Sequence, residues 1–213
     1  MSQITYREAL RMALQESMRE DSTIIVMGED VGLYGGAYGV TKGMIEEFGE
    51  KRILDTPISE EGIVGCAVVS AMTGLRPVVE LMYVDFVMLA MDQLANQAAK
   101  IRYMFGGQIS VPMVMRAQGG TGRSGAAQHS QSLEAWMMHT PGLNLAMPAT
   151  VNDAYLLLKH ALKLSDPVVF IEHKMLYTLK GDLNKSESIS WGQAAILRSG
   201  SDFTLVTLSL IHI

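Results

Sequence analysis

The stretch Asp55-Thr-Pro-Ile-Ser-Glu-Glu-Gly-Ile-Val-Gly65 ends a short extended segment and begins a helix. Ser59 is suited to cap that helix, and Glu60 and Glu61 stand in its first turn, where the helix dipole favours anionic side chains. The glycines that follow leave room for a close neighbour. Ordinary helix capping would account for all of these residues, so the stretch by itself predicts a strand-to-helix junction and no specific chemistry.

Short apolar runs and helical segments alternate on both sides of this junction. A capping box of Thr5 and Glu8 begins the first helix, and apolar residues follow it at helical spacing. Continuous hydrophobicity is typical of strands covered on both faces, so we predict an α/β fold with a three-layer parallel sheet, whose ligands lie beyond the carboxyl ends of the strands. Helices are predicted at 86–104 and 151–164, and strands at 23–27, 77–81, 111–115, 143–147 and 167–171.

Composition limits the classes of function. The chain is 48% apolar and 18% charged with a net charge of -5, which indicates a soluble globular protein with a large core. No lysine or arginine cluster favours nucleic acid, and no apolar run approaches the ~20 residues that cross a membrane. The first residues do not resemble a leader, so we expect a cytoplasmic protein. Cys66 lacks a disulfide partner and is expected to be a small core residue on a buried helix.

Four motifs occur along the chain in a specific order. They are Asp55-Thr-Pro-Ile-Ser-Glu60, Gly74-Leu-Arg-Pro77, Ala90-Met-Asp-Gln93 and Ala127-Gln-His-Ser-Gln131. With this set, the chain from Ile4 to Thr207 resembles the beta subunits of the thiamine-diphosphate-dependent 2-oxoacid dehydrogenases, whose relatives act on pyruvate, branched-chain 2-oxoacids or acetoin. The resemblance implies a transketolase-like pyrimidine-binding domain.

The resemblance also implies roles for individual residues. The family glutamate that matches Glu60 hydrogen-bonds a ring nitrogen of the cofactor aminopyrimidine, and Glu61 is expected to point away from that ring. Phe86 is expected to stack on the pyrimidine with Met82 beside it, although ordinary core packing would explain Met82 equally well. The family histidine that matches His129 assists proton transfer or lipoyl acylation.

Further residues are assigned by the same resemblance. Glu29 matches an acidic residue that communicates between paired cofactor sites; the alternative is a plain loop carboxylate. Family members bind structural potassium through backbone carbonyls, which here implies Met113, Ala161, Leu162, Leu164 and Asp166. Carbonyl ligands leave little trace in a sequence, and most helix ends bind no ion.

The second half of the cofactor site is expected on another chain. The family motif for magnesium and the diphosphate, Gly-Asp-Gly followed by Asn-Asn, does not occur here. The resemblance therefore implies an alpha subunit that supplies magnesium, in a two-alpha, two-beta heterotetramer, together with a lipoyl acyltransferase core as a further partner. The helix at 86–104 has the small apolar residues of an interface, although a buried helix would look the same.

The end of the sequence predicts a change of domain. We expect a pyrimidine-binding domain at 4–177, a polar linker at 178–189 and, at 190–213, the truncated start of a second α/β domain with a strand at 202–207. The last residues, Leu208-Ser-Leu-Ile-His-Ile213, do not resemble the family continuation and are interpreted as foreign to it.

Several functions remain open at this stage. The resemblance leaves the substrate open, because the substrate pocket of the family includes residues of the alpha subunit. Oxidative decarboxylation of pyruvate ranks first and the acetoin reaction second, with the branched-chain reaction as a further alternative. A truncated, non-catalytic fragment that only binds a partner is the main alternative of another class. A dinucleotide-binding module is disfavoured because the glycines at 28–39 lack the required spacing.

Overall fold

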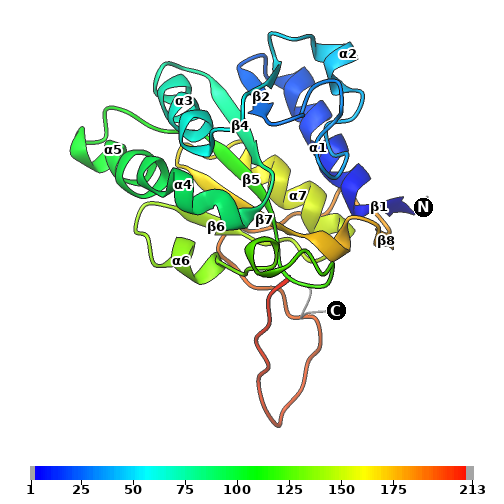
Figure 1. Ribbon diagram of the computed structural model, residues 1–213. Helices are drawn as coiled ribbons and strands as arrows, with labels where there is room; N and C mark the ends of the chain where they lie inside the picture. The colour runs from blue at the N-terminus through cyan, green and yellow to red at the C-terminus, as the bar shows by residue number, and fades with distance from the viewer. Residues whose placement is uncertain (1–2, 210–213) are drawn as a thin grey trace.

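The computed structural model describes residues 3–209 (Figure 1). Its centre is a six-stranded sheet in which every pair of neighbouring strands is parallel. The predicted α/β architecture with a parallel sheet is confirmed. In order across the sheet, the strands are β3 (Ile53–Asp55), β2 (Ile24–Gly28), β4 (Arg76–Leu81), β5 (Val114–Gly119), β7 (Val168–His173) and β6 (Asn144–Ala146).

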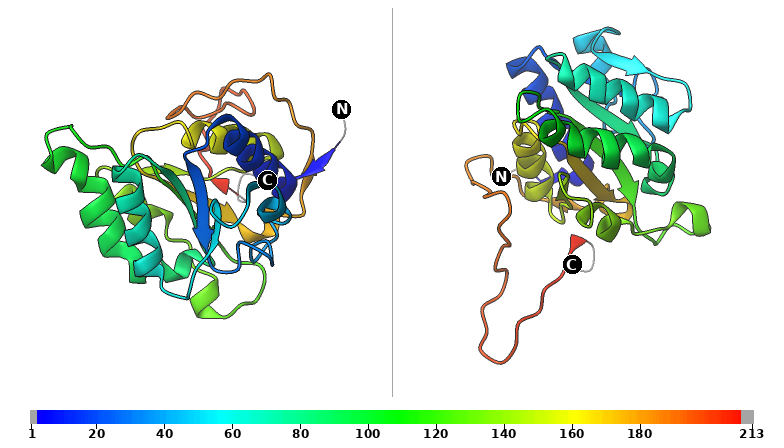
Figure 2. Two further views of the ribbon diagram at one scale, coloured as in Figure 1. Left: turned by 90° about the horizontal axis from the view of Figure 1, so that it is seen from above. Right: turned by 90° about the vertical axis from the view of Figure 1, so that its left-hand side faces the viewer.

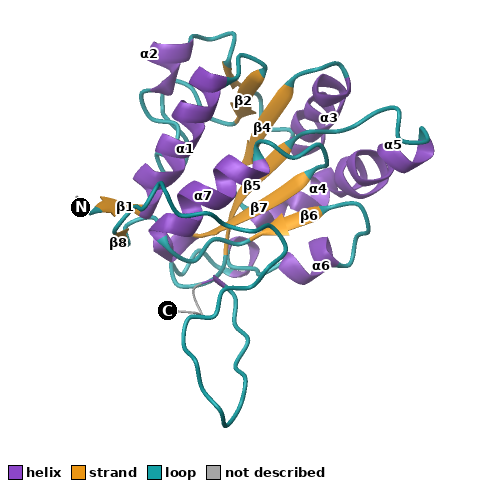
Figure 3. Cartoon of the chain, turned by 180° about the vertical axis from the view of Figure 1, so that it is seen from behind, coloured by secondary structure: helices purple, strands orange, loops and turns teal. Residues whose placement is uncertain are grey.

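One face of the sheet is covered by α1 (Tyr6–Glu20) and α7 (Val151–Ala161), which lie side by side (Figure 3). Each helix begins with a capping box, formed by Thr5 with Glu8 and by Thr150 with Asp153, so its first free N–H groups are satisfied. The predicted capping box at Thr5 is confirmed.

The opposite face is covered by α3 (Glu60–Met72), α4 (Val87–Asp92), a π-helical segment (Gln93–Ala98) and α5 (Ala99–Met104). Figure 2 shows these helices on the other side of the sheet from α1 and α7. The predicted helix at 86–104 is therefore interrupted by a wider turn, a feature that is often found near functional sites. Two short helices, α2 (Met44–Phe48) and α6 (Glu134–Met138), lie in the connections.

Two apolar clusters explain why the strands are hydrophobic along their whole length. Val78, Val114 and Val168 pack toward α1 and α7, whereas their neighbours Val79, Met115 and Val169 belong to the cluster under α3 and α4. Successive side chains of a strand point to opposite faces, so both sets are buried in a three-layer fold.

Some local expectations were wrong. Cys66 is exposed because it lies on the outer side of α3, away from the sheet. The strand predicted at 111–115 begins only at Val114 and extends to Gly119. Ser59 is the N-cap of α3, but its side chain makes no capping hydrogen bond.

The two ends of the predicted first domain meet in a small antiparallel sheet. In it, β1 (Ile4–Thr5) pairs with β8 (Lys180–Gly181). The polar segment that was predicted as a linker at 178–189 thus contains two residues, Lys180 and Gly181, that pair with the start of the domain.

Residues 182–208 contain neither helix nor strand. Their first part lies against the domain, where Leu183 and Trp191 pack on the core and Lys185 pairs with Glu16 of α1. The later residues extend from the body as an open loop (Figure 1). The strand predicted at 202–207 is not formed: Phe203, Leu205 and Val206 are exposed, and the segment has no neighbouring strand to share backbone hydrogen bonds. The segment interpreted as foreign begins at Leu208, and its residues 210–213 lie outside the described residues. No helix in the described range is long and apolar enough to cross a membrane.

Candidate active site

The carboxyl ends of the parallel strands place several of the predicted residues along one edge of the sheet. Glu29 follows β2, Met82 and Phe86 follow β4, and the loop that carries His129 follows β5. Gly28 is paired with Glu80, and Leu81 is paired with Ala117, so these strands end at nearly the same level. Residues from distant parts of the sequence are therefore brought to one edge, as expected for an open parallel sheet.

Glu60 and Glu29 form an acidic pair at this edge. Glu60 is buried in the first turn of α3, whereas its neighbour Glu61 is exposed. One carboxylate oxygen of Glu29, Oε1, is buried and has no hydrogen-bond partner among the described residues. Burial, followed by the charges of Glu60 and Asp30, raises the pKa of Glu29. A buried carboxylate oxygen without a donor is unfavourable, so Glu29 Oε1 is suited to receive a hydrogen bond from a ligand.

Phe86 and His129 meet beside this edge. Their ring centroids are 5.4 Å apart with the planes nearly perpendicular, and the His129 ring also lies 4.8 Å from that of Tyr83. Phe86 and Tyr83 in turn make an edge-to-face contact at 5.9 Å. Edge-to-face packing fixes the position of the imidazole without using its nitrogens, which leaves them free for proton transfer.

The loop from Gly120 to Gln131 holds His129 in place. It is closed at its base by a 3.0 Å hydrogen bond from the Gly120 N–H to the Gln131 carbonyl, and the Gln131 N–H donates to Asp85 Oδ1 at 3.0 Å. The backbone of Ala126 adopts φ 64° and ψ -177°, a conformation that residues other than glycine rarely take. Strain of this kind persists only where the surroundings enforce it, and here it immediately precedes the turn that carries His129.

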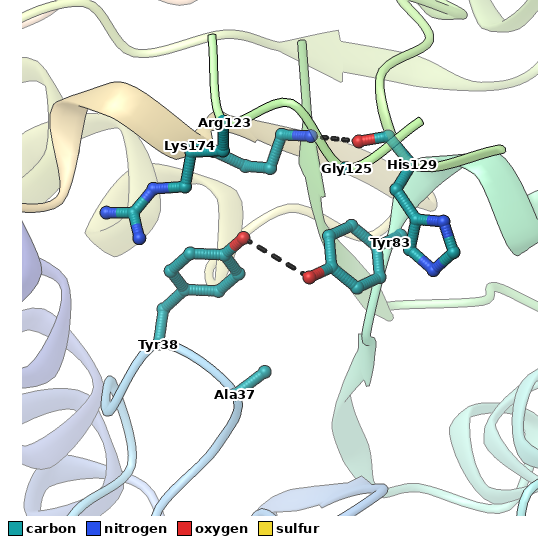
Figure 4. Close-up of a pocket in the computed structure, with 7 residues that line it drawn as sticks. All are labelled: Ala37, Tyr38, Tyr83, Arg123, Gly125, His129 and Lys174. Carbon is teal, nitrogen blue, oxygen red and sulfur yellow. Dashed lines mark hydrogen bonds between the residues drawn. The ribbon is translucent and has the colours of Figure 1, made fainter. Parts of the chain in front are cut away.

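His129 also lines a cavity of about 510 Å³, together with Tyr38 and Tyr83 (Figure 4). The Tyr38 and Tyr83 hydroxyls lie 3.5 Å apart across it, and Lys174 donates a hydrogen bond to the His129 carbonyl. Glu29, Glu60, Met82 and Phe86 do not line this cavity. It is connected with the predicted cofactor residues through His129 and Tyr83, whose rings both contact Phe86. The cavity is lined by Ala37, Tyr38, Tyr83, Arg123, Gly125, His129 and Lys174.

A buried ionic network, which no sequence motif indicated, lies beneath the site. Arg116 of β5 donates to Glu172 of β7 at 2.6 and 2.8 Å and to Glu80 of β4 at 2.6 Å, and all three side chains are almost fully buried. Tyr177 also donates to Glu172, and its ring stacks on Tyr38 at 4.6 Å. The sequence did contain a signal for this network, because Glu80, Arg116 and Glu172 each lie within a largely apolar strand. Buried charges require partners of opposite charge, so these residues could have been predicted to pair.

The carbonyls predicted to bind potassium lie at the opposite end of the strands. The carbonyls of Leu162 and Leu164 converge on one nitrogen of Arg76, at 3.0 and 2.9 Å, and the Met113 carbonyl accepts from Val168 at 2.9 Å. A guanidinium thus already supplies positive charge at two of these carbonyls. The Asp166 side chain pairs with Arg102 at 2.7 Å. The part of the chain that the structure describes contains no group of three or more His, Cys, Asp or Glu residues placed to hold a metal ion.

Comparison with known proteins identifies the family of the domain. The model of the family "Transketolase, pyrimidine binding domain" matches residues 2–180. The chain belongs to this family. Its pyrimidine-binding domain is therefore the six-stranded unit described above, and in this family such a domain binds the pyrimidine half of thiamine diphosphate.

Curated relatives match over nearly all of the chain. The pyruvate dehydrogenase E1 component subunit beta of Rhizobium meliloti is 47% identical over 99% of this chain and 46% of its own length. The subunit of the same name from Rickettsia conorii is 48% identical over 98% of this chain and 64% of its own length. The 2-oxoisovalerate dehydrogenase subunit beta of Bacillus subtilis is 44% identical over 99% of this chain and 65% of its length.

A solved structure confirms the fold. "Split gene transketolase, inactive beta4 tetramer" superposes with a TM-score of 0.79 at 20% identity, covering 98% of this chain and 64% of that one. At this identity the likeness concerns the fold alone. The chain spans less than two thirds of the length of the curated relatives and the solved structure named here.

Proposed function

We propose that this domain supplies the pyrimidine half of a thiamine diphosphate site in the beta subunit of a 2-oxoacid dehydrogenase. The observation that carries the proposal is the acidic pair: Glu60 is buried at the start of α3, beside a Glu29 oxygen that has no donor among the described residues. A carboxylate so placed fits a nitrogen heterocycle that offers N–H groups. The similarity to beta subunits of dehydrogenases supports the same proposal.

Each predicted residue then has a defined task. Glu60 would accept a hydrogen bond from a pyrimidine ring nitrogen, and Phe86 and Met82 would provide the apolar wall that a flat ring requires. Burial, followed by the charges of Glu60 and Asp30, raises the pKa of Glu29, which therefore keeps a proton more readily than an ordinary carboxyl. His129 holds or moves a proton at the substrate. Thiamine diphosphate, when bound, supplies the carbon nucleophile that attacks the 2-oxo group.

The reaction that we propose is oxidative decarboxylation of pyruvate with transfer of the acyl group to a lipoyl group. The pyruvate dehydrogenase relatives, at 47 and 48% identity, favour pyruvate. The proposed partners are an alpha subunit, which holds the diphosphate and magnesium in a heterotetramer, and a lipoyl acyltransferase core. Potassium at the carbonyls around Leu164 remains part of the proposal.

A branched-chain 2-oxoacid is the second candidate substrate, because the 2-oxoisovalerate relative is 44% identical over nearly the whole chain. Acetoin remains a third. A non-catalytic partner-binding fragment is the alternative of another class.

The test is turnover of pyruvate, branched-chain 2-oxoacids and acetoin by this chain co-expressed with a family alpha subunit, with added thiamine diphosphate. Glu60→Gln should abolish turnover and leave the complex intact. Glu61→Gln is the matched control, because Glu61 is the adjacent residue on the same helix and is exposed. Equal activity of the two variants would refute the role of Glu60, and a stable wild-type complex without turnover would favour the non-catalytic alternative.

A further inference from the structure

The cavity beside His129 contains a lysine that is buried without an anionic partner in contact. Lys174 is only 1% exposed, and its ammonium group donates to the His129 carbonyl. It also lies 5.4 Å from the centre of the Tyr83 ring. An ammonium group has three donors, and no acceptor other than the His129 carbonyl is found for Lys174 within residues 3–209. A buried ammonium group with only one acceptor is unfavourable, so Lys174 can donate further hydrogen bonds to a bound anion.

Arg123 adds a second positive charge to the same cavity. Its guanidinium lies over the Tyr38 ring, 5.5 Å from the centre, and Figure 4 shows it on the same side as Lys174. None of the ion pairs in the described part of the chain involves Arg123 or Lys174. The cavity therefore presents two cations above two tyrosine hydroxyls.

Nearby carboxylates offset only part of the positive charge of this pair. The charge of Asp85 acts on Lys174, but Asp85 accepts from the Gln131 N–H and does not line the cavity. The charge of Glu134 acts on the neighbouring His173, which also lies outside the lining. With Asp85 set against Lys174, one positive charge remains at Arg123.

We propose that this cavity binds the carboxylate of a small 2-oxoacid, with Arg123 and Lys174 as the positioning residues. A guanidinium pairs with a carboxylate through two parallel hydrogen bonds, and the tyrosine hydroxyls provide further donors. The acid would lie beside His129, which lines the cavity and contacts Phe86. The choice of a 2-oxoacid rests on the proposed function, whereas the anion site itself is built from residues of this chain alone.

The test measures binding to the 213-residue chain without any partner. Pyruvate, neutral acetoin and inorganic phosphate are titrated separately and followed by ligand-observed NMR. Arg123→Gln should weaken pyruvate binding about tenfold, the effect of losing one charge-assisted contact, and Lys174→Met should weaken it at least as much. Arg198→Gln is the matched control, because Arg198 is exposed in the open loop and should leave the affinity unchanged.

Acetoin should bind more weakly than pyruvate and should not respond to Arg123→Gln, because it has no carboxylate. Equal affinity for pyruvate and acetoin, absence of pyruvate binding, or an unchanged affinity in Arg123→Gln would overturn the proposal. Phosphate binding as tight as that of pyruvate would likewise contradict a carboxylate site. Arg123 is on the exposed loop, so this variant tests the site even if Lys174→Met fails to fold.

The two proposals can fail separately. Pyruvate binding that depends on Arg123, in a chain whose complex with an alpha subunit shows no turnover, would refute the enzyme function and keep the anion site. Turnover that depends on Glu60, with a pyruvate KM unaffected by Arg123→Gln, would keep the function and remove the anion site.

Discussion

Replacement of Arg116 by Met tests the buried network that supports the site. The guanidinium makes three short hydrogen bonds to Glu80 and Glu172, and the three side chains are at most 2% exposed. Met has a similar length but no charge, so two buried carboxyl groups would lose their cation. Removing one partner of a buried pair costs about 3–5 kcal/mol. That is a large part of the roughly 5–15 kcal/mol by which a domain is stable.

The loss should depend on pH. Burial raises the pKa of Glu172, and the charge and hydrogen bonds of Arg116 oppose this increase. Without Arg116 the folded-state pKa of Glu172 rises further above its unfolded value. Because the folded-state pKa of Glu172 is raised, its contribution to stability is fully present below the unfolded-state pKa. That contribution is lost as the pH rises through the folded-state pKa. The variant should therefore be closest to wild type near pH 5 and furthest from it near pH 8.

The assay is urea unfolding followed by circular dichroism at both pH values. Arg198→Met, at an exposed position, is the control and should change the free energy of unfolding by less than about 0.5 kcal/mol. The double variant Arg116→Met with Glu172→Gln should recover part of the loss, because it removes one of the two uncompensated charges. A loss below about 1 kcal/mol at pH 8, or an equal loss at both pH values, would refute the reasoning.

Three further predictions concern single positions. Ala126→Gly should stabilise the domain by about 1 kcal/mol in urea unfolding, because glycine adopts φ 64° without strain; a destabilised variant would contradict this. Thr150→Ala removes the side-chain acceptor of a capping box and should cost about 1 kcal/mol in the same assay, whereas Thr150→Ser should cost little; equal losses would exclude the cap as the cause. Cys66 is exposed, so it should react completely with a thiol reagent in native buffer, and a reaction that requires denaturant would show that α3 is covered.

Local signals in the sequence were reliable where neighbouring residues decide the structure. The capping box at Thr5 depends on residues three positions apart, and the apolar runs marked all the strands of the large sheet except β3 to within a few residues. Cys66 was misplaced because α3 is apolar on every side, so periodicity does not distinguish its outer face from its inner face. The expected strand at 202–207 has β-forming residues but lacks a neighbouring strand, and an isolated strand leaves its backbone groups without partners.

The candidate site was only partly accessible from the sequence. Glu29, Glu60, Met82, Phe86 and His129 were named through motifs, and the structure brings Phe86 against His129 and the charge of Glu60 near Glu29. The cavity residues Tyr38, Arg123 and Lys174 carry no motif that the analysis used. They became candidates only when the fold placed them around one space.

The sequence by itself determined which segments form strands and helices and, through its motifs, which family the domain resembles. The tertiary structure alone decided that β5 lies between β4 and β7, and with it the contact of Arg116 with Glu80 and Glu172, which lie 36 and 56 residues away. The same packing set Lys174 against His129, 45 residues apart. Hydrogen bonds, burial and charge act across a few ångströms of space, so contacts between distant segments depend on strand order and not on spacing along the chain.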